Sequence, residues 1–215
     1  TPKILLENNS QSFIEIQLKN FIALGASKFV YLTGHLNKPI EEKIELLARQ
    51  YSHVDIDYLS EGERPLGTGG AVSNAFKQLS FKNAFITYGD NFLEFDLFSF
   101  NKFCRNKEVS IAMSVFRNNN LYDRSNIEFD NGSITRYSKD KSKEFNYIDY
   151  GFSFVKKEFF LNQSPVDKNF DLSGIFSSAA DLLFLKGYEV PNRFYEIGSV
   201  AGLEEFRAHF KKNEF

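Results

Sequence analysis

The sequence predicts an α/β fold, namely a Rossmann-like, three-layer α/β/α arrangement built on a mostly parallel mixed sheet with a small antiparallel hairpin extension. Up to residue 88, helical patterns alternate with short apolar strands, which is typical of a parallel sheet with helices on both faces. Further along, an Asn-Gly pair between two alternating stretches indicates a β-hairpin. No repeat or linker divides the chain, so residues 1–215 are expected to form one domain.

The first half predicts helices and strands in alternation. Ser10 and Ser12 can cap the first helix, and Gly25 can close it in the left-handed conformation. Pro39 starts the second helix because its fixed φ suits a first helical turn. The expected segments are, in order, a helix over residues 13–24, a strand over 28–33, a helix from residue 39, a strand over 54–58, a helix around 72–79 and a strand over 84–88.

The second half predicts a partly antiparallel arrangement. Asp130-Asn131-Gly132 is the expected hairpin turn, because Asn-Gly accepts the positive φ angles of a tight turn. Cys104 lies in a stretch that is typical of a helix. The remaining expected segments are a strand over residues 110–116, hairpin strands over 126–129 and 133–137, a strand over 150–155, a helix around 173–186, and a closing strand and helix from 194 to 210.

Composition and charge disfavour several classes of partner. With 42% hydrophobic and 25% charged residues, the chain has the composition of an ordinary globular protein. A formal net charge of −2 gives no electrostatic reason to expect nucleic acid or an anionic membrane, and the apolar runs are too short to cross a bilayer. The single cysteine cannot form an internal disulfide, which fits a reducing cytoplasm. No function is assigned to His35, His53 and His209, which lack metal-ligand spacing.

A glycine-rich loop over residues 65–71 connects a predicted strand to a predicted helix. Glycines let a backbone approach a ligand closely, so the amides around Gly67 and Gly70 are expected to face one, with the Thr68 hydroxyl at the tip. The spacing differs from a Walker-type phosphate loop, which needs Gly-Lys-Ser/Thr at the start of the helix. A tight turn without a ligand is the alternative.

Carboxylates accompany glycines where three predicted strands begin or end. Asp90 follows Gly89 directly after an apolar strand, Asp149 comes two residues before Gly151, and Glu196 ends a short strand. Mg²⁺ takes such oxygens, using one or two protein carboxylates together with substrate phosphates. Because an α/β topology gathers loops at one rim of the sheet, Asp90 and Glu196 are expected to lie together. Roles in turns or helix caps are the alternative for each.

Two lysines are candidate cations for a bound phosphate. Lys3 follows Thr-Pro at the start of the sequence, and Lys139 follows the predicted hairpin. A solvated surface charge is the alternative for both residues.

The order of these motifs resembles the sugar-1-phosphate nucleotidyltransferases, also called nucleoside-diphosphate-sugar pyrophosphorylases, over almost the whole chain. The resemblance implies that Lys3 contacts phosphate, that the glycine-rich loop cups the nucleobase and that Asp90 holds a metal ion. Glu196 matches a second metal-binding residue, which is Asp in the family and one methylene shorter. The matching stretches are residues 1–7, 65–71, 88–90 and 194–199.

Within that family the chain is similar to mannose- or heptose-1-phosphate guanylyltransferase-like proteins, through residues 115–118, 123–126 and 147–151. The likeness implies Mg²⁺ as cofactor and, as substrates, a sugar 1-phosphate and an NTP, with GTP favoured and CTP, UTP or dTTP as alternatives. The implied nucleotide contacts are Leu66, Gly67, Thr68, Gly70 and Gly89. The implied sugar-phosphate contacts are Asn91, Lys139, Asp149 and Gly151.

The family opens with a strand and a Gly-Gly-x-Gly-Thr-Arg loop that cradles the triphosphate, and residues 1–215 contain no counterpart. We expect that opening to have been disordered, removed or cut away, or the protein to be a degenerate relative.

The resemblance implies a reaction that yields an NDP-sugar and pyrophosphate. The NDP-sugar is expected to serve cell-surface polysaccharide synthesis, and the protein is expected in the cytoplasm. Homo-oligomerisation is left open. The alternative is an inactive nucleotide- or sugar-phosphate-binding relative. A nicotinamide-dependent dehydrogenase is disfavoured, because no Gly-x-Gly-x-x-Gly follows a strand with an acidic residue about 20 positions later.

Overall fold

The computed structural model describes residues 2–34, 37–62, 64–138, 140, 144–166 and 169–212. The chain divides into two compact units. Unit 1 comprises Thr1–Glu63, Tyr88–Glu94 and Phe194–Phe215, and unit 2 comprises Arg64–Thr87 and Phe95–Arg193. The division reflects contact density, so one domain over residues 1–215 stays a prediction.

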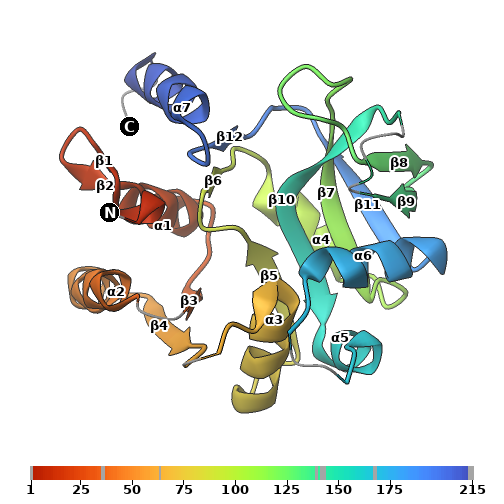
Figure 1. Ribbon diagram of the computed structural model, residues 1–215, viewed down its shortest axis with the longest axis horizontal. Coiled ribbons are helices and arrows are strands. Elements are labelled where there is room, and N and C mark those ends of the chain that lie inside the picture. Colours follow the sequence, from red (N-terminus) through yellow and green to blue (C-terminus); the bar gives the residue numbers. More distant parts are fainter. Residues whose placement is uncertain are drawn as a thin grey trace. The chain divides into compact units, whose positions relative to one another are not determined.

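The helices and strands of unit 1, labelled in Figure 1, pack around two clusters of apolar side chains. Its described elements are η1 (Lys3–Leu5), β1 (Glu7–Asn8), β2 (Gln11–Ser12), α1 (Phe13–Ala23), β3 (Lys28–Thr33), α2 (Lys38–Gln50), β4 (Asp55–Ser60), β6 (Asn91–Phe92), β12 (Tyr195–Glu196) and α7 (Val200–Lys212). Gly25, which follows the C-cap residue Leu24 of α1, has φ of +92°, as expected of a left-handed helix end. Strands β3 and β4 pair in parallel, as the alternation of helices and strands predicts.

The β3–β4 pair is covered by α1 and α2. Ile14 and Leu18 from α1 pack with Ile44 and Leu47 from α2, and all four side chains are buried. In β4, Ile56 and Tyr58 pack against this cluster while Asp55 and Asp57 are exposed. The period of two in β4 therefore places its apolar side chains against the helices.

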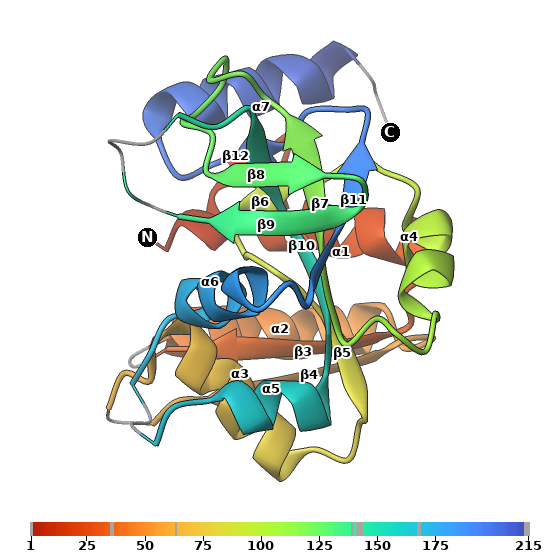
Figure 2. The ribbon, with the colours of Figure 1, turned by 90° about the vertical axis from the view of Figure 1, so that its right-hand side faces the viewer.

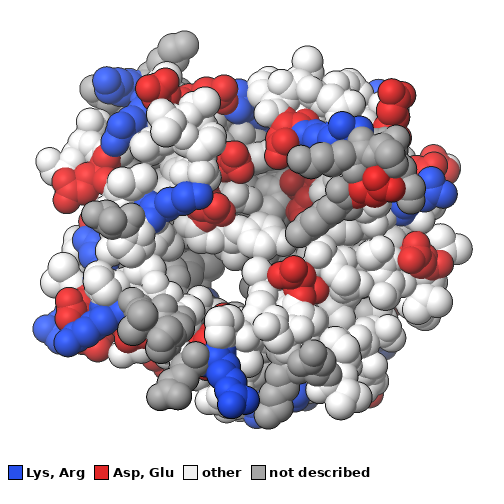
Figure 3. Space-filling model, in the orientation of Figure 1, with Lys and Arg blue, Asp and Glu red and all other residues white. Residues whose placement is uncertain are grey.

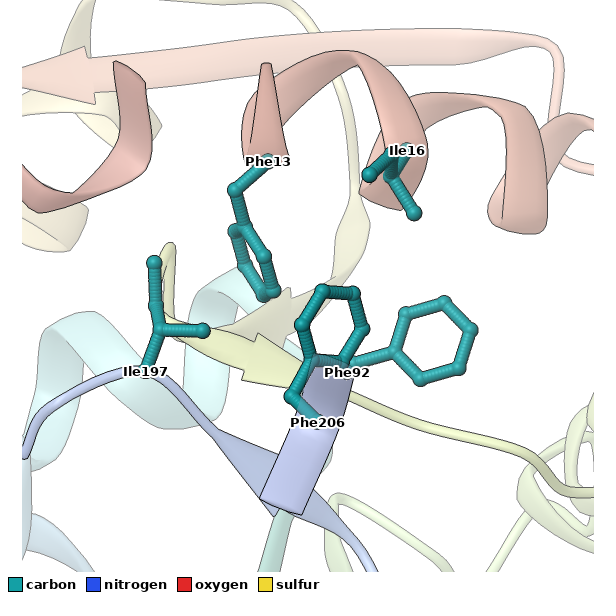
Figure 4. Packing of buried hydrophobic residues seen from close by; sticks show 5 residues of the cluster. All are labelled: Phe13, Ile16, Phe92, Ile197 and Phe206. Carbon is teal, nitrogen blue, oxygen red and sulfur yellow. The ribbon is translucent and has the colours of Figure 1, made fainter. Parts of the chain in front are cut away.

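A second cluster in unit 1 joins segments that are far apart in the sequence (Figure 4). Phe13 and Ile16 of α1 pack with Phe92 of β6, with Phe206 of α7 and with Ile197, which directly follows β12. The ring of Phe206 lies 5.1 Å from that of Phe13 and 5.3 Å from that of Phe92, both edge-to-face. Such ring pairs add to the free energy gained by burying their apolar area, so this cluster fixes α1, β6 and α7 against one another.

Unit 2 is a mixed sheet with helices. Its described elements are α3 (Gly67–Gln78), β5 (Asn83–Thr87), α4 (Leu97–Cys104), β7 (Ile111–Arg117), β8 (Ile127–Asp130), β9 (Ser133–Tyr137), β10 (Tyr147–Lys156), α5 (Lys157–Gln163), α6 (Leu172–Asp181) and β11 (Leu185–Val190). The strand order is β5-β10-β7-β11-β9-β8, with a further pairing of β10 to β8. Figure 2 shows the hairpin β8–β9 beside β11, as this order requires.

The sheet of unit 2 departs from the mostly parallel sheet that the sequence predicts. Among its described pairings only β7 with β11 is parallel, because the long strand β10 lies between β5 and β7 and runs antiparallel to both. Alternating helices and strands indicate parallel crossovers only for neighbouring segments, and β5 and β10 are separated by several elements. A pairing over that distance has no local signal in the sequence.

The predicted helix over residues 173–186 is also corrected. It ends at Asp181, and β11 follows over Leu185–Val190. Leu183 adopts φ of +60°, which turns the chain out of the helix. The continuous apolar stretch around this turn suits either a buried helix or a strand, so hydrophobic pattern alone does not separate the two. The predicted hairpin turn is present, with positive φ at Asn131 and Gly132.

Figure 3 shows Lys and Arg side chains interspersed with Asp and Glu on the face in view, as the small net charge suggests.

Among the described residues, none of the helices combines the length and apolar character needed to cross a membrane.

We predict that Phe206→Ala lowers the free energy of unfolding by about 3–5 kcal/mol, because it leaves a cavity between two buried rings. Chemical denaturation measures the change. Phe98→Ala is the control, since Phe98 is 76% exposed, and it should change stability by about 0.5 kcal/mol or less. Equal losses in the two variants would contradict the packing described for unit 1.

A second prediction concerns Cys104, the last residue of α4. Burial raises the pKa of its thiol to about 12, so the thiol stays protonated at neutral and mildly alkaline pH. A thiol reagent such as Ellman's reagent at pH 8 should therefore modify Cys104 only after denaturant is added. Rapid modification of the native protein would show that α4 is not packed as described.

Candidate functional site

Asp90 and Glu196 are brought together by a short antiparallel pairing in unit 1. In the β6–β12 ladder, Glu196 is the partner of Asn91 and Tyr195 is the partner of Phe92. The next hydrogen bond runs from the amide of Ile197 to the carbonyl of Asp90, at 2.9 Å. Asp90, which directly precedes β6, and Glu196, the last residue of β12, therefore lie at the same end of the ladder, where the sequence predicts a metal site.

The two carboxylates converge beside Gly198. A Cβ atom on Gly198 would lie 3.5 Å from Glu196 Oε2 and 3.7 Å from Asp90 Oδ2. Both side chains are half-buried. The extra methylene of Glu196, relative to an Asp, thus does not prevent its carboxylate from reaching the space next to Asp90.

A cation is tied to the same loop. Lys3 Nζ donates a hydrogen bond to the Gly198 carbonyl at 2.6 Å. The Lys3 side chain is exposed, so its ammonium group is accessible to a solute anion. Unit 1 therefore joins a lysine and two carboxylates from three separate parts of the sequence.

Several residues outside the predicted set hold this arrangement in place. Gln17 Nε2, from α1, donates to the carbonyls of Tyr88 at 2.9 Å and Asn91 at 2.7 Å, on either side of Asp90. In α7, a Cβ on Gly202 would overlap the Glu196 carbonyl, so glycine lets the helix approach β12. The sequence carries no signal for Gln17, which looks like an ordinary polar helix residue.

Gly89 also has a packing role. A Cβ there would lie 3.1 Å from Ile4 Cδ1, so glycine permits η1 to pack beside the segment that carries Asp90. Gly89 and Asn91, both predicted to contact substrate, thus flank Asp90 in unit 1.

The donor set fits a hard divalent cation. The described residues include no cluster of three or more His, Cys, Asp or Glu side chains that could hold a metal by themselves. A pair of carboxylates is nevertheless sufficient for Mg²⁺, which usually completes its shell with water and substrate phosphate oxygens. Asp90 and Glu196 together match that requirement in chemical type and in number.

The glycine-rich loop of unit 2 differs from the prediction. The amides of Gly69 and Gly70 donate to the Phe170 carbonyl, at 2.9 and 3.1 Å, rather than facing a ligand. The Thr68 hydroxyl accepts a hydrogen bond from the Leu172 amide at 2.9 Å and lies 3.2 Å from Asp171 Oδ1. Thr68 therefore caps the start of α6 instead of standing unbound at the tip of the loop.

Close packing explains why glycines occupy this loop. Gly67 has φ of +69°, and a Cβ there would lie 2.6 Å from the Phe170 carbonyl oxygen. A Cβ on Gly69 would overlap the Phe170 ring. Leu66 accepts a further hydrogen bond from the Phe170 amide at 3.0 Å. The loop is thus bound to the segment before α6, an approach of two backbones that has no local signal in the sequence.

Asp149 and Gly151 form a bend in β10. Asp149 Oδ1 accepts a hydrogen bond from the Gly151 amide at 2.8 Å, and Gly151 has φ of +89°. The pairing of β10 with β7 shifts register between Asp149 and Ser153, so the ladder is irregular at this bend. Asp149 thereby has a structural role in unit 2, while Lys139 lies outside the described residues.

Comparison with known proteins identifies the fold. No family model matches the chain, and no curated protein matches it by sequence. Among solved structures, HddC from Yersinia pseudotuberculosis superposes with a TM-score of 0.78 at 17% identity, over 98% of this chain and 90% of that one. The fold is that of the sugar-phosphate nucleotidyltransferases.

Two further structures support the nucleotidyltransferase fold. The inositol-1-phosphate CTP transferase from T. maritima has a TM-score of 0.77 at 16% identity, over 98% of this chain and 88% of that one. UDP-glucose pyrophosphorylase from Acinetobacter baumannii has a TM-score of 0.77 at 13% identity, over 97% and 85%. A mixed α/β fold of this kind is therefore confirmed, and at these identities the likeness shows the fold alone.

We predict opposite effects for two glycine substitutions in unit 2. Gly67→Ala should lower the free energy of unfolding by about 2 kcal/mol or more, because it combines positive φ with a clash against Phe170. Gly174→Ala, in α6 with open space around its Cβ, should raise it by about 0.5–1 kcal/mol through helix propensity. Denaturant titration measures both, and a neutral Gly67→Ala would contradict the packing of the loop.

Proposed function

We propose that this protein transfers a nucleotidyl group from an NTP to a sugar 1-phosphate, giving an NDP-sugar and pyrophosphate. The observation that carries the proposal is the convergence of Asp90 and Glu196 beside Gly198, with Lys3 bound to the same loop. It is supported by the nucleotidyltransferase fold. Among the structures that share this fold, HddC is complexed with GMP-PN and a UDP-glucose pyrophosphorylase with UDP-glucose.

The proposed reaction needs no protein nucleophile. A phosphate oxygen of the sugar 1-phosphate attacks the α-phosphorus of the NTP and forms a new P–O bond. The bond between the α-phosphorus and the oxygen that bridges it to the β-phosphorus breaks. Pyrophosphate carries away the electron pair and the negative charge. The protein has to align the two phosphates and to offset their repulsion, which agrees with a site built from carboxylates and a lysine rather than a catalytic triad.

Asp90 and Glu196 would hold Mg²⁺ in this reaction, and the bound ion would offset negative charge on the phosphate oxygens. The ammonium group of Lys3 would supply a further positive charge from the same loop. We also propose Lys139 as a phosphate contact, on the basis of the sequence alone.

The remaining substrate contacts are proposals from sequence similarity. Leu66, Gly67, Thr68 and Gly70, together with Gly89, would contact the nucleotide, through atoms other than the Gly69 and Gly70 amides that Phe170 engages. Asn91, Asp149 and Gly151 would contact the sugar phosphate.

The identities of the nucleobase and of the sugar are likewise proposed from sequence similarity. GTP is the first nucleotide to test, with CTP, UTP and dTTP as alternatives, and mannose or heptose 1-phosphate the first acceptors. A cytoplasmic role in cell-surface polysaccharide synthesis, without nucleic acid or membrane partners and with homo-oligomerisation open, would fit these substrates.

A second candidate is an inactive relative that binds a nucleotide or a sugar phosphate without reaction. Glu196 favours it, because the family has Asp at this position and metal geometry depends on side-chain length. Pyrophosphate release separates the two, measured with each NTP and sugar phosphate in the presence of Mg²⁺. If no pair releases pyrophosphate but one nucleotide raises the melting temperature, the inactive binder is favoured.

For an active protein, Asp90→Asn should reduce kcat/KM by about 10²-fold or more, since it removes one anionic metal ligand. The melting temperature should change little, because a half-buried strand-end side chain contributes little packing. The matched control is Asp57→Asn, an exposed carboxylate of β4 in the same unit, which should keep full activity. Full activity of Asp90→Asn, or a loss of activity explained by unfolding, would contradict the proposed role of Asp90.

A further inference from the structure

The ladder that aligns Asp90 with Glu196 is very short. Strands β6 and β12 have two residues each and pair only with one another among the described strands. An isolated two-stranded pair is marginally stable in water. Side chains around β6 and β12 must therefore contribute to holding the two carboxylates in register.

A histidine of α7 connects the two sides of this ladder. His209 Nδ1 lies 3.0 Å from the hydroxyl of Tyr195, a residue of β12. His209 Nε2 lies 2.8 Å from Oε2 of Glu94, two residues beyond the end of β6. The imidazole also stacks on the Tyr195 ring, with centroids 4.2 Å apart and an interplanar angle of 19°.

The contacts of His209 with Tyr195 and Glu94, together called the His209 bridge, are suited to a rigid support. The side chains of His209 and Glu94 are 19% and 26% exposed, so water competes only partly with their hydrogen bond. A neutral imidazole can donate from Nε2 to Glu94 while Nδ1 accepts from the Tyr195 hydroxyl, which satisfies both ring nitrogens. The ring is thus fixed in orientation by two hydrogen bonds and one stacking contact.

The bridge is separate from the contacts that dock α7. Phe206 of the same helix is fully buried between Phe13 and Phe92, and Arg207 Nη2 donates to the Glu7 carbonyl at 3.0 Å. Removal of the imidazole should therefore leave α7 in place. It would remove the side-chain bridge that runs from Tyr195, next to Glu196, to Glu94, four residues after Asp90.

We propose that His209 is a positioning residue for the metal site. It holds the segment after β6 against β12, so that the carboxylates of Asp90 and Glu196 stay aligned on the same cation. In this role His209 acts through its contacts to Tyr195 and Glu94. The inference rests on the proposed function, because it assigns a purpose to the alignment of two metal ligands.

The first test measures the ladder directly and needs neither metal nor turnover. Amide hydrogen exchange at Ile197 by NMR reports on its hydrogen bond to the Asp90 carbonyl. His209→Ala should speed this exchange about tenfold or more, because the ladder opens more often. Arg207→Ala, on the same helix and also removing one hydrogen bond, is the matched control and should leave the exchange unchanged.

The second test measures the metal. His209→Ala should weaken Mn²⁺ binding, followed by EPR, and raise the Mg²⁺ concentration for half-maximal activity, each about 10- to 100-fold, as loss of a supporting partner typically does. The KM for the sugar 1-phosphate at saturating Mg²⁺ should not change. His209→Gln, whose amide offers both a donor and an acceptor, should recover part of the loss.

The outcomes separate the two proposals. Equal Ile197 exchange in His209→Ala and Arg207→Ala overturns the positioning role, whether or not the protein is an active transferase. Faster exchange with unchanged Mn²⁺ affinity also overturns it, because the bridge is then only structural. A wild-type protein that does not bind Mn²⁺ and releases no pyrophosphate overturns the metal site itself and the proposed function with it.

Discussion

A backbone hydrogen bond from Ile197 to Asp90 closes the ladder that joins two segments from opposite halves of the sequence. Every feature of the candidate site in unit 1 depends on this pairing. It sets Glu196 beside the strand end that carries Asp90, and the turn at Gly198 then presents its carbonyl to Lys3. Because the ladder is so short, it needs support from its surroundings, which include the apolar cluster around Phe206, the Gln17 side chain and the proposed bridge through His209.

The electrostatics of the site follow from that geometry. Two carboxylates that converge on one small volume repel each other, and each gains from a nearby positive charge. Lys3 supplies one such charge on the same loop, and a divalent cation would supply a stronger one. This arrangement agrees with the proposed phosphate chemistry, in which negative charge moves from one group to another.

The glycines illustrate how one sequence pattern can have two physical origins. In unit 2, Gly67 and Gly69 are required because the chain at Phe170 approaches the loop backbone, and the Phe170 carbonyl accepts hydrogen bonds from the Gly69 and Gly70 amides. In unit 1, Gly198 has ordinary space around its Cβ position, and the nearest atoms there belong to the two carboxylates. A bare run of glycines does not distinguish close backbone packing from an approach to a ligand.

The sequence by itself determined most of the local elements, and it singled out Asp90 and Glu196 as an acidic pair. Gly25 closes α1, Asn131-Gly132 turns the hairpin, and Asp90 follows an apolar strand, since each feature depends on neighbours within a few residues. Only the tertiary structure decided that β10 runs antiparallel between β5 and β7 and that Phe170 engages the glycine loop. It also decided that His209 spans Tyr195 and Glu94. These contacts join residues far apart in the chain, and they are selected by burial and hydrogen bonding in the whole fold, which no local pattern encodes.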